Sequence, residues 1–119
     1  MSANLSLYYH DSHGMNPVGR EITCHRILEY WDEKTTSYNT MPNSNPVECA
    51  STLVPGNFTW VDWNVTSEVD DFINDGVSNY GWMIRDYKNP VQYNCNHWYY
   101  SLDSNNDYPP RLFVWINTL

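Results

Sequence analysis

The strongest constraint on the fold is an apolar pattern that repeats at every second residue. In the segment 58–65 (FTWVDWNV), aromatic and β-branched side chains alternate with polar ones. This alternation is typical of a β-strand with one buried face. Weaker versions of the pattern predict strands over 4–9, 20–28, 48–54, 81–85, 92–102 and 112–117.

Turn-forming residues separate these strands. The segment 10–16 is a polar loop ahead of Pro17, Pro55-Gly56-Asn57 reads as a turn, and Pro109-Pro110 interrupts the last connection. Many short strands joined in this way predict an all-β fold, a jelly-roll-like β-sandwich of antiparallel strands. A chain of 119 residues suits one domain, so we expect a single domain over 1–119.

One short segment, about 66–75, has helical character instead. Thr66 or Ser67 is expected to cap its start, and the acidic residues that follow suit the positive end of a helix dipole. Gly76 is placed to end it. Three apolar residues at i, i+3 and i+4 are expected to face the core: Val69, Phe72 and Ile73.

Alternation also predicts which side chains are buried. The face of 58–65 that carries Val61 and Val65 should be core, which makes Trp63 a packing residue and leaves Trp60 more exposed. In the strand 20–28, the inward face carries the following residues: Ile22, Cys24, Arg26 and Leu28. A charge turned inward needs a carboxylate, so we expect Arg26 to pair with Glu33 or Asp103.

The charge balance excludes several partners. Six Lys and Arg residues against 14 Asp and Glu residues give a formal net charge of -8. Nucleic-acid binding and docking on anionic membranes both rest on basic residues, so neither partner is expected. No apolar run approaches the roughly 18 residues of a membrane span, so no membrane insertion is expected.

Four stretches in order resemble one family. The stretch 31–39 (WDEKTTSYN), closing at Pro42, resembles the W-x-E-x-T-x-[ST]-[WY]-N…P signature of DNRLRE domains, which include the disaggregatase-related repeats of archaeal surface proteins. Three further stretches resemble the family's "D-V-T-x-x-V", "G…N-Y-G-[WFL]" and "S-x-[DE]-S…P-x-L-x-[VI]" patterns: 62–67 (DWNVTS) with Val69, Gly76 with 79–82 (NYGW), and 101–104 (SLDS) with 110–114 (PRLFV). The resemblance covers essentially the whole chain.

The beginning of the chain departs from the family pattern. DNRLRE domains usually have several strands before the one that resembles 2–8 (SANLSLY), so the resemblance implies a domain that is incomplete at its N-terminus. A missing strand would leave open sheet edges and an uncovered apolar face. We therefore expect self-association through those edges.

The resemblance implies a function. Members of the family are similar to jelly-roll carbohydrate-binding modules and commonly occur as non-catalytic parts of large secreted proteins. The resemblance therefore implies a non-catalytic module that binds a polysaccharide or cell-surface glycan. Two alternatives remain open: a structural or adhesive surface domain without a small ligand, or an accessory fragment of a polysaccharide-degrading enzyme such as a disaggregatase.

Aromatic and amide side chains on strands are the candidates for sugar binding. Pyranose C–H faces stack on exposed aromatic rings, while sugar hydroxyls hydrogen-bond Asn, Asp and Arg. Alternation places the predicted contact residues on the polar faces of two strands: Trp60, Asn64, Asn94, Asn96, Trp98 and Tyr100. Plain packing is the competing interpretation for each aromatic ring.

A calcium site is one interpretation of the segment 103–107 (DSNND). Asp103, Asn105 and Asp107 place oxygen-bearing side chains at i, i+2 and i+4, which is how a calcium loop opens. An EF-hand is excluded because no Gly follows Asp107 and Val114 stands where the closing Glu would fall. The alternative is an Asx-type turn.

Sequons and cysteines bear on the compartment. Three sequons, at Asn4, Asn57 and Asn64, suit an extracellular or cell-surface protein, although an Asn-rich chain also produces them by chance. The three cysteines, Cys24, Cys49 and Cys95, show no metal-binding spacing, and each lies in apolar surroundings. They are expected to be buried free thiols, with the redox context open.

Catalytic motifs are absent from the sequence. No nucleophile elbow, phosphate-binding loop or Ser/His/Asp motif occurs, and the paired acids at 70–71 are explained by the start of the predicted helix. We therefore expect the chain not to be an enzyme.

Overall fold

The structure, a computed structural model, describes residues 1–14, 18–56, 58–86, 95–99 and 107–116. Its elements follow in chain order: β1 (Ser2–Gly14), β2 (Glu21–Arg26), the 3-10 helix η1 (Tyr38–Thr40), β3 (Ala50–Leu53), β4 (Trp60–Asn64), α1 (Thr66–Asn74), β5 (Trp82–Arg85), β6 (Cys95–Tyr99) and β7 (Arg111–Trp115). Among the described residues, no helix has the length and apolar character needed to cross a membrane.

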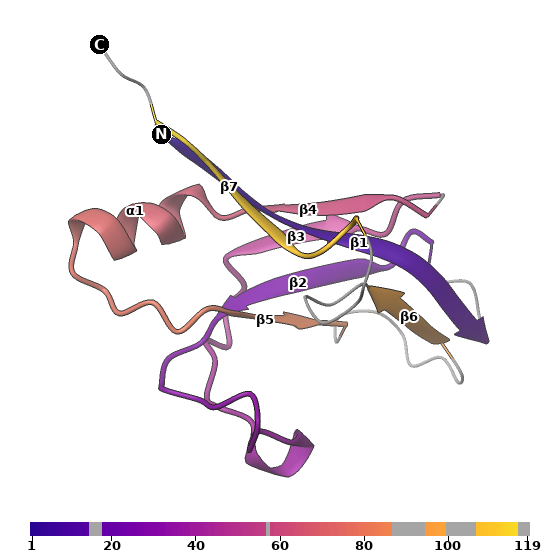
Figure 1. The fold of residues 1–119 in the computed structure, drawn as a ribbon, viewed down its shortest axis with the longest axis horizontal. Coiled ribbons are helices and arrows are strands. Elements are labelled where there is room, and N and C mark those ends of the chain that lie inside the picture. Colours follow the sequence, from indigo (N-terminus) through magenta and orange to yellow (C-terminus); the bar gives the residue numbers. More distant parts are fainter. Residues whose placement is uncertain (15–17, 57, 87–94, 100–106, 117–119) are drawn as a thin grey trace.

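The described strands form two antiparallel sheets (Figure 1). In the first sheet, β4 lies on one side of β1, and both β7 and β6 lie on the other. Strand β7 pairs with the first half of β1, and β6 pairs with its second half. In the second sheet, β2 lies between β3 and β5. The all-β sandwich predicted from the alternating pattern is confirmed.

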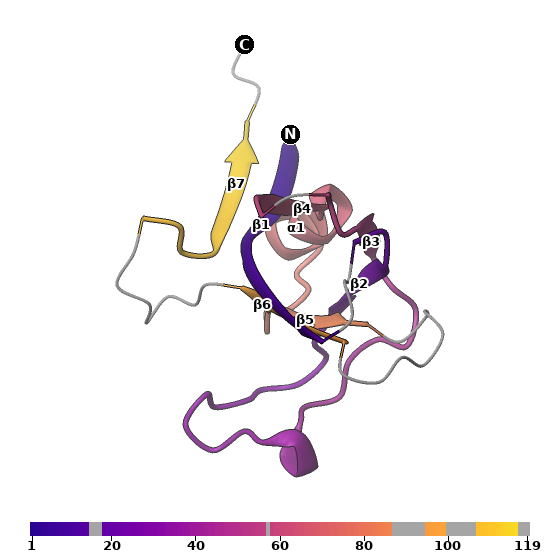
Figure 2. The ribbon, with the colours of Figure 1, turned by 90° about the vertical axis from the view of Figure 1, so that its right-hand side faces the viewer.

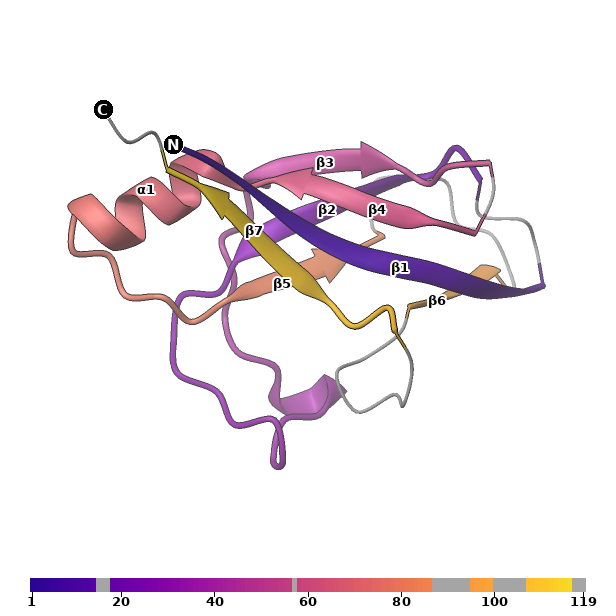
Figure 3. The same ribbon diagram turned by 45° about the horizontal axis from the view of Figure 1, so that its top comes forward.

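The two sheets enclose a common interior (Figure 2). Figure 3 shows α1 at one end of the sandwich, next to the start of β1 and the end of β4. The segment between β2 and β3, which contains η1, projects away from both sheets. Strand β7 is an edge strand of the first sheet, and among the described strands it pairs with β1 alone.

The core is built from alternate residues of the facing strands. Trp63 is 0% exposed, and its indole Nε1 donates a hydrogen bond to the carbonyl oxygen of Ile22 at 3.0 Å, which ties β4 to β2 across the two sheets. The predicted burial of Val61, Trp63 and Val65 is confirmed. Burying a large aromatic side chain with its polar atom satisfied stabilises both sheets together.

Strand β1 is longer than the sequence pattern predicts. We expected a polar loop from His10, but the strand continues to Gly14. The second half of β1 pairs with β6, in a register that joins Ser12 to His97 and His13 to Asn96. The prediction was wrong because a polar segment becomes a strand when another strand, distant in sequence, offers it hydrogen-bonding partners.

The predicted helix is confirmed as α1, with two corrections at its start and on its buried face. Its N-cap is Val65, and the Asn64 side chain accepts the hydrogen bond from the Thr66 N–H at 3.1 Å. Ile73 is 61% exposed, and Glu68 is buried with Val69. Glu68 points inward because its carboxylate accepts a hydrogen bond from the Arg26 guanidinium there.

Arg26 has other partners than those predicted. Its guanidinium donates from Nε to Glu68 at 2.8 Å and from Nη2 to Glu68 and Asp71 at 2.5 and 2.6 Å. Glu33 is exposed, so the expectation that it pairs with Arg26 was wrong, and Asp103 lies outside the described residues. Helix α1 supplies the carboxylates because the Arg26 side chain, at the end of β2, reaches it and also lies over the Phe72 ring, which no local pattern reveals.

The inward face of 20–28 also needs one correction. Ile22 and Cys24 are buried as predicted, but Leu28 is 50% exposed and Ile27 is 4% exposed. The alternation ends because β2 stops at Arg26 and Ile27 instead forms an isolated bridge with Ser44.

Candidate functional site

A groove lies on the outer face of the first sheet, over its three adjacent strands β4, β1 and β7. It has a volume of about 330 Å³ and is lined by residues from all three strands: Asn4, Ser6, Trp60, Asp62, Arg111, Phe113 and Trp115. The strand register sets the positions, because Ser6 opposes Asp62 on one side and Arg111 on the other. We call it the outer groove.

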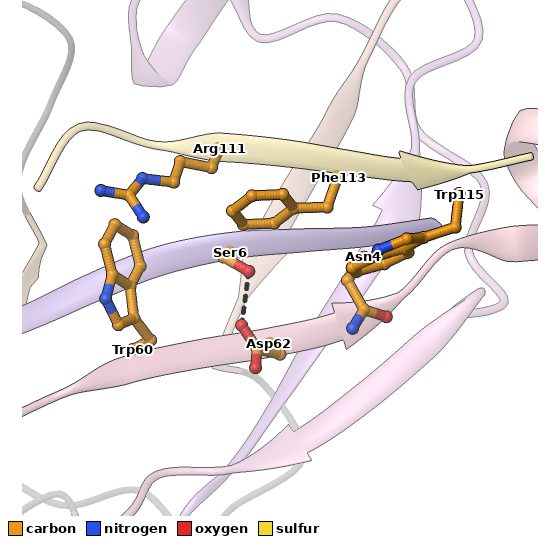
Figure 4. A pocket seen from close by; sticks show the side chains of 7 residues that line it. All are labelled: Asn4, Ser6, Trp60, Asp62, Arg111, Phe113 and Trp115. Atoms are coloured by element: carbon orange, nitrogen blue, oxygen red, sulfur yellow. Dashed lines mark hydrogen bonds between the residues drawn. The ribbon is translucent and has the colours of Figure 1, made fainter. Parts of the chain in front are cut away.

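Aromatic rings form the walls of the outer groove (Figure 4). Trp60 and Trp115 lie towards its two ends, and Phe113 stacks on Trp115 with ring centroids 5.8 Å apart. Phe113 is 41% exposed and Trp115 is 52% exposed. Large apolar rings left open beside polar groups are a feature of ligand-binding surfaces.

Further aromatic residues pack beside Trp60. Its ring meets Tyr8 edge-on at 5.4 Å, and Tyr8 stacks on Tyr108 at 4.4 Å. On the groove side, the Arg111 guanidinium lies 4.2 Å from the centre of the Trp60 ring, a cation–π contact. These contacts hold the Trp60 ring in one orientation before any ligand binds.

Polar side chains make up the floor. Ser6 is 3% exposed, and its hydroxyl donates a hydrogen bond to the Asp62 carboxylate. Arg111 also donates from Nη2 to the Asp107 carbonyl oxygen at 3.2 Å. The outer groove therefore offers one cation, one anion and the Asn4 amide between aromatic walls.

Of the sugar-binding residues predicted from the sequence, the structure shows one, Trp60, in the outer groove. Trp60 lines it, whereas Asn64 lies on the same face of β4 but uses its side-chain oxygen to accept hydrogen bonds from Thr66 N and Oγ1, at 3.1 and 2.7 Å. Asn96 and Trp98 belong to β6, whose side chains the structure does not describe. The remaining predicted sugar contacts and two of the predicted calcium ligands lie outside the described residues: Asn94, Tyr100, Asp103 and Asn105.

Sequence reasoning missed the contribution of β7. Arg111, Phe113 and Trp115 alternate along the strand and so share one face, which is a signal that the sequence contains. The missing information was that β7 pairs with β1, more than a hundred residues away along the chain.

A second hollow lies in the projecting segment between β2 and β3. It has a volume of about 220 Å³, and its lining comes from the stretch that resembles the DNRLRE signature and the two residues before it: Glu29, Tyr30, Trp31, Asp32, Thr35, Thr36, Thr40 and Pro42. Trp31 Nε1 donates to the Tyr80 carbonyl oxygen at 2.7 Å, and the Asp32 carbonyl accepts from Thr36 N at 2.9 Å. The signature residues thus fold this segment and fasten it to the residues before β5.

Three carboxylates gather on α1 and its C-cap residue, with oxygen atoms of Asp70, Asp71 and Asp75 all within 4.8 Å of one another. The Arg26 guanidinium lowers the pKa of Asp71, while the hydrogen bond and negative charge of Asp71 raise the pKa of Asp75. Asp70 accepts a hydrogen bond from Asn74 at 2.6 Å. Two of the three acids already have protein partners, Asp71 with Arg26 and Asp70 with Asn74. The cluster by itself is therefore no evidence for a metal site.

The chain matches a known protein family. The family model of carbohydrate-binding module family 96 matches residues 1–115. Neither the curated proteins nor the solved structures gave a significant match.

Proposed function

The chain belongs to carbohydrate-binding module family 96, and we propose that it binds a polysaccharide in the outer groove. The observation that carries this proposal is the alternation of open aromatic rings with polar side chains on three adjacent strands. The family membership gives the class of ligand, and the groove supplies a surface of matching chemistry.

The rings are suited to stacking against sugars. A pyranose presents apolar C–H faces, and its hydroxyls lie around the ring edge. Trp60, Phe113 and Trp115 supply apolar surface, while Asn4, Asp62 and Arg111 supply hydrogen-bonding groups at their edges.

The groove is also organised before binding. The cation–π contact of Arg111 with Trp60 and the hydrogen bond of Ser6 with Asp62 fix side chains that would otherwise lose conformational entropy when a sugar binds. The volume of about 330 Å³ is at the lower end of the range for small-molecule sites, so a short stretch of polysaccharide fits it better than a branched assembly.

Both signs of charge are present in the groove, and they bear on the ligand. Arg111 can donate charge-assisted hydrogen bonds to a sugar hydroxyl or carboxylate, and Asp62 can accept them from a hydroxyl. The formal net charge of -8 opposes long-range attraction of polyanionic glycans. Neutral and acidic polysaccharides therefore both belong in the test.

The test measures binding to a panel of soluble polysaccharides by affinity gel electrophoresis, with tryptophan fluorescence titration as the second readout. Trp115→Ala is expected to weaken binding about tenfold or more, as removal of a central aromatic contact does. Trp115 belongs to an edge strand and is 52% exposed, so the substitution leaves the core intact.

Tyr30→Ala is the matched control. Tyr30 is 78% exposed and lines the second hollow, away from the outer groove. Full binding by this variant and weakened binding by Trp115→Ala would support the proposal. The reverse pattern would move binding to the second hollow, and no binding by the folded wild-type chain across the panel would favour a structural or adhesive domain.

We propose calcium as an aid to binding, on the basis of the oxygen-bearing side chains in 103–107. Asp107 lies four residues from Arg111 and accepts its hydrogen bond through the backbone carbonyl, so Asp107 itself lies next to the outer groove. Repeating the titration with calcium and then with chelator tests the idea. Equal affinity in both solutions would contradict it.

We propose an extracellular or cell-surface location, which the sequons support. Two of them, Asn4 and Asn64, oppose each other in the register of β1 and β4. Asn4 lines the outer groove, so a glycan attached there would compete with an incoming sugar. Cell fractionation tests the location, and recovery of the protein only from the cytoplasm would contradict it.

A further inference from the structure

Two cysteines lie side by side in the second sheet. Cys24 is in the middle of β2 and is 0% exposed, and Cys49 stands in a bend just before β3, where it is partly exposed. Cys49 N donates to the Cys24 carbonyl oxygen at 2.8 Å, and the Cys49 thiol donates to the same oxygen at 3.3 Å. Both are free thiols; Cys24 belongs to the core cluster, and Cys49 is partly buried and packs against it.

The two thiols also shift each other's pKa. The hydrogen bond with Cys49, together with burial, raises the pKa of the Cys24 thiol above its ordinary value. The same hydrogen bond lowers the pKa of Cys49. Cys49 is therefore both the more accessible thiol and the one that more readily becomes a thiolate, the form that attacks disulfides.

The backbone hydrogen bond from Cys49 N to the Cys24 carbonyl oxygen holds the two residues side by side. A disulfide requires Cα atoms roughly 4.4–6.8 Å apart, and residues that are hydrogen-bonded across antiparallel segments are about 5.5 Å apart. Cys24 opposes Ala50 in the strand register, and the thiol of Cys49, in the bend just before Ala50, reaches the Cys24 carbonyl oxygen. We propose that Cys24 and Cys49 form an intramolecular disulfide when the protein meets a small-molecule disulfide such as oxidised glutathione.

The reaction is thiol–disulfide exchange in two steps. The Cys49 thiolate attacks one sulfur of oxidised glutathione, forming a mixed disulfide and releasing one glutathione thiolate. Cys24 then attacks the Cys49 sulfur, its proton passing to the departing glutathione thiolate, which leaves as the second glutathione thiol. In the balance, two protein thiols are oxidised to one disulfide, and one molecule of oxidised glutathione is reduced to two thiols.

The bond would constrain the projecting segment. The chain between the two cysteines contains the second hollow and η1. Closing a loop of this length restricts the unfolded chain, so the oxidised protein is expected to melt several degrees above the reduced one.

The experiment is a non-reducing tryptic map of the native chain after incubation with oxidised glutathione and alkylation of the remaining thiols. Cleavage after Lys and Arg places the three cysteines in separate peptides, 21–26, 35–85 and 89–111. We expect the first two to be joined and the third to be alkylated or to carry glutathione. The matched variant Cys95→Ser is expected to keep the cross-link and the higher Tm, and Cys49→Ser to lose both.

Three results would overturn the assignment. Glutathione on Cys49 with Cys24 still alkylated would show that Cys24 is out of reach. A cross-link from either peptide to 89–111 would show a different pairing. Full alkylation of both thiols after prolonged oxidation of a chain with unchanged circular dichroism would show that no disulfide forms between them.

Discussion

Replacing Glu68 with alanine is expected to destabilise the fold strongly. The Glu68 carboxylate accepts two hydrogen bonds from Arg26, and the side chains of the pair are 11% and 17% exposed. Removing one partner of such a pair costs about 3–5 kcal/mol because it leaves a buried charge without compensation. Arg26 keeps Asp71, which places the loss at about 3 kcal/mol, near the lower end.

The assay is urea unfolding at pH 7 followed by tryptophan fluorescence, with a thermal melt as the second measurement. At about 4 °C per kcal/mol for a chain of this size, the Tm should fall by about 12 °C. Glu33→Ala is the control, because Glu33 is exposed and the sequence alone made it a candidate partner of Arg26. It should change the free energy of unfolding by less than about 0.5 kcal/mol.

A double replacement separates loss of the ion pair from loss of packing. Arg26→Met with Glu68→Leu replaces the pair with apolar side chains, so it should be much less destabilising than the sum of the two single changes. A Glu68→Ala variant as stable as the wild type would refute the reasoning. So would a Glu33→Ala variant that loses as much as Glu68→Ala.

Two smaller effects are also expected, the first at the end of α1 and the second in its acidic cluster. Gly76 has φ +68°, so Gly76→Ala should lower the free energy of unfolding by about 1 kcal/mol in urea unfolding. Gly56→Ala should not lower it, because Gly56 has no positive φ and no atoms near the added Cβ. Equal losses in the two variants would contradict the backbone argument. Asp75 has its pKa raised above the ordinary value of 3.8 by Asp71, so its ionised form is disfavoured in the folded state and costs stability at neutral pH. Asp75→Asn should therefore raise the Tm at pH 7, with a gain that disappears as the pH falls below 3.8, and a gain of the same size at pH 3 would contradict this origin.

The sequence by itself determined the class of fold and most of the strands. Alternation alone placed Val61, Trp63 and Val65 inside and Trp60 outside, because successive side chains of a strand point to opposite faces. It also located α1 and its end before Gly76, because caps and glycines act over a few residues. These are local effects, and the residues that cause them are neighbours in the chain.

Only the tertiary structure decided which strands lie together. The second half of β1 is a strand because β6 pairs with it, and Arg26 binds Glu68 because α1 packs beside β2. The outer groove exists because β7 aligns Arg111, Phe113 and Trp115 with β1 and β4, so that residues from both ends of the chain form one surface. Alternation fixes the face on which a side chain lies, but strand order depends on the free energy of the whole packed sandwich, which no short segment contains.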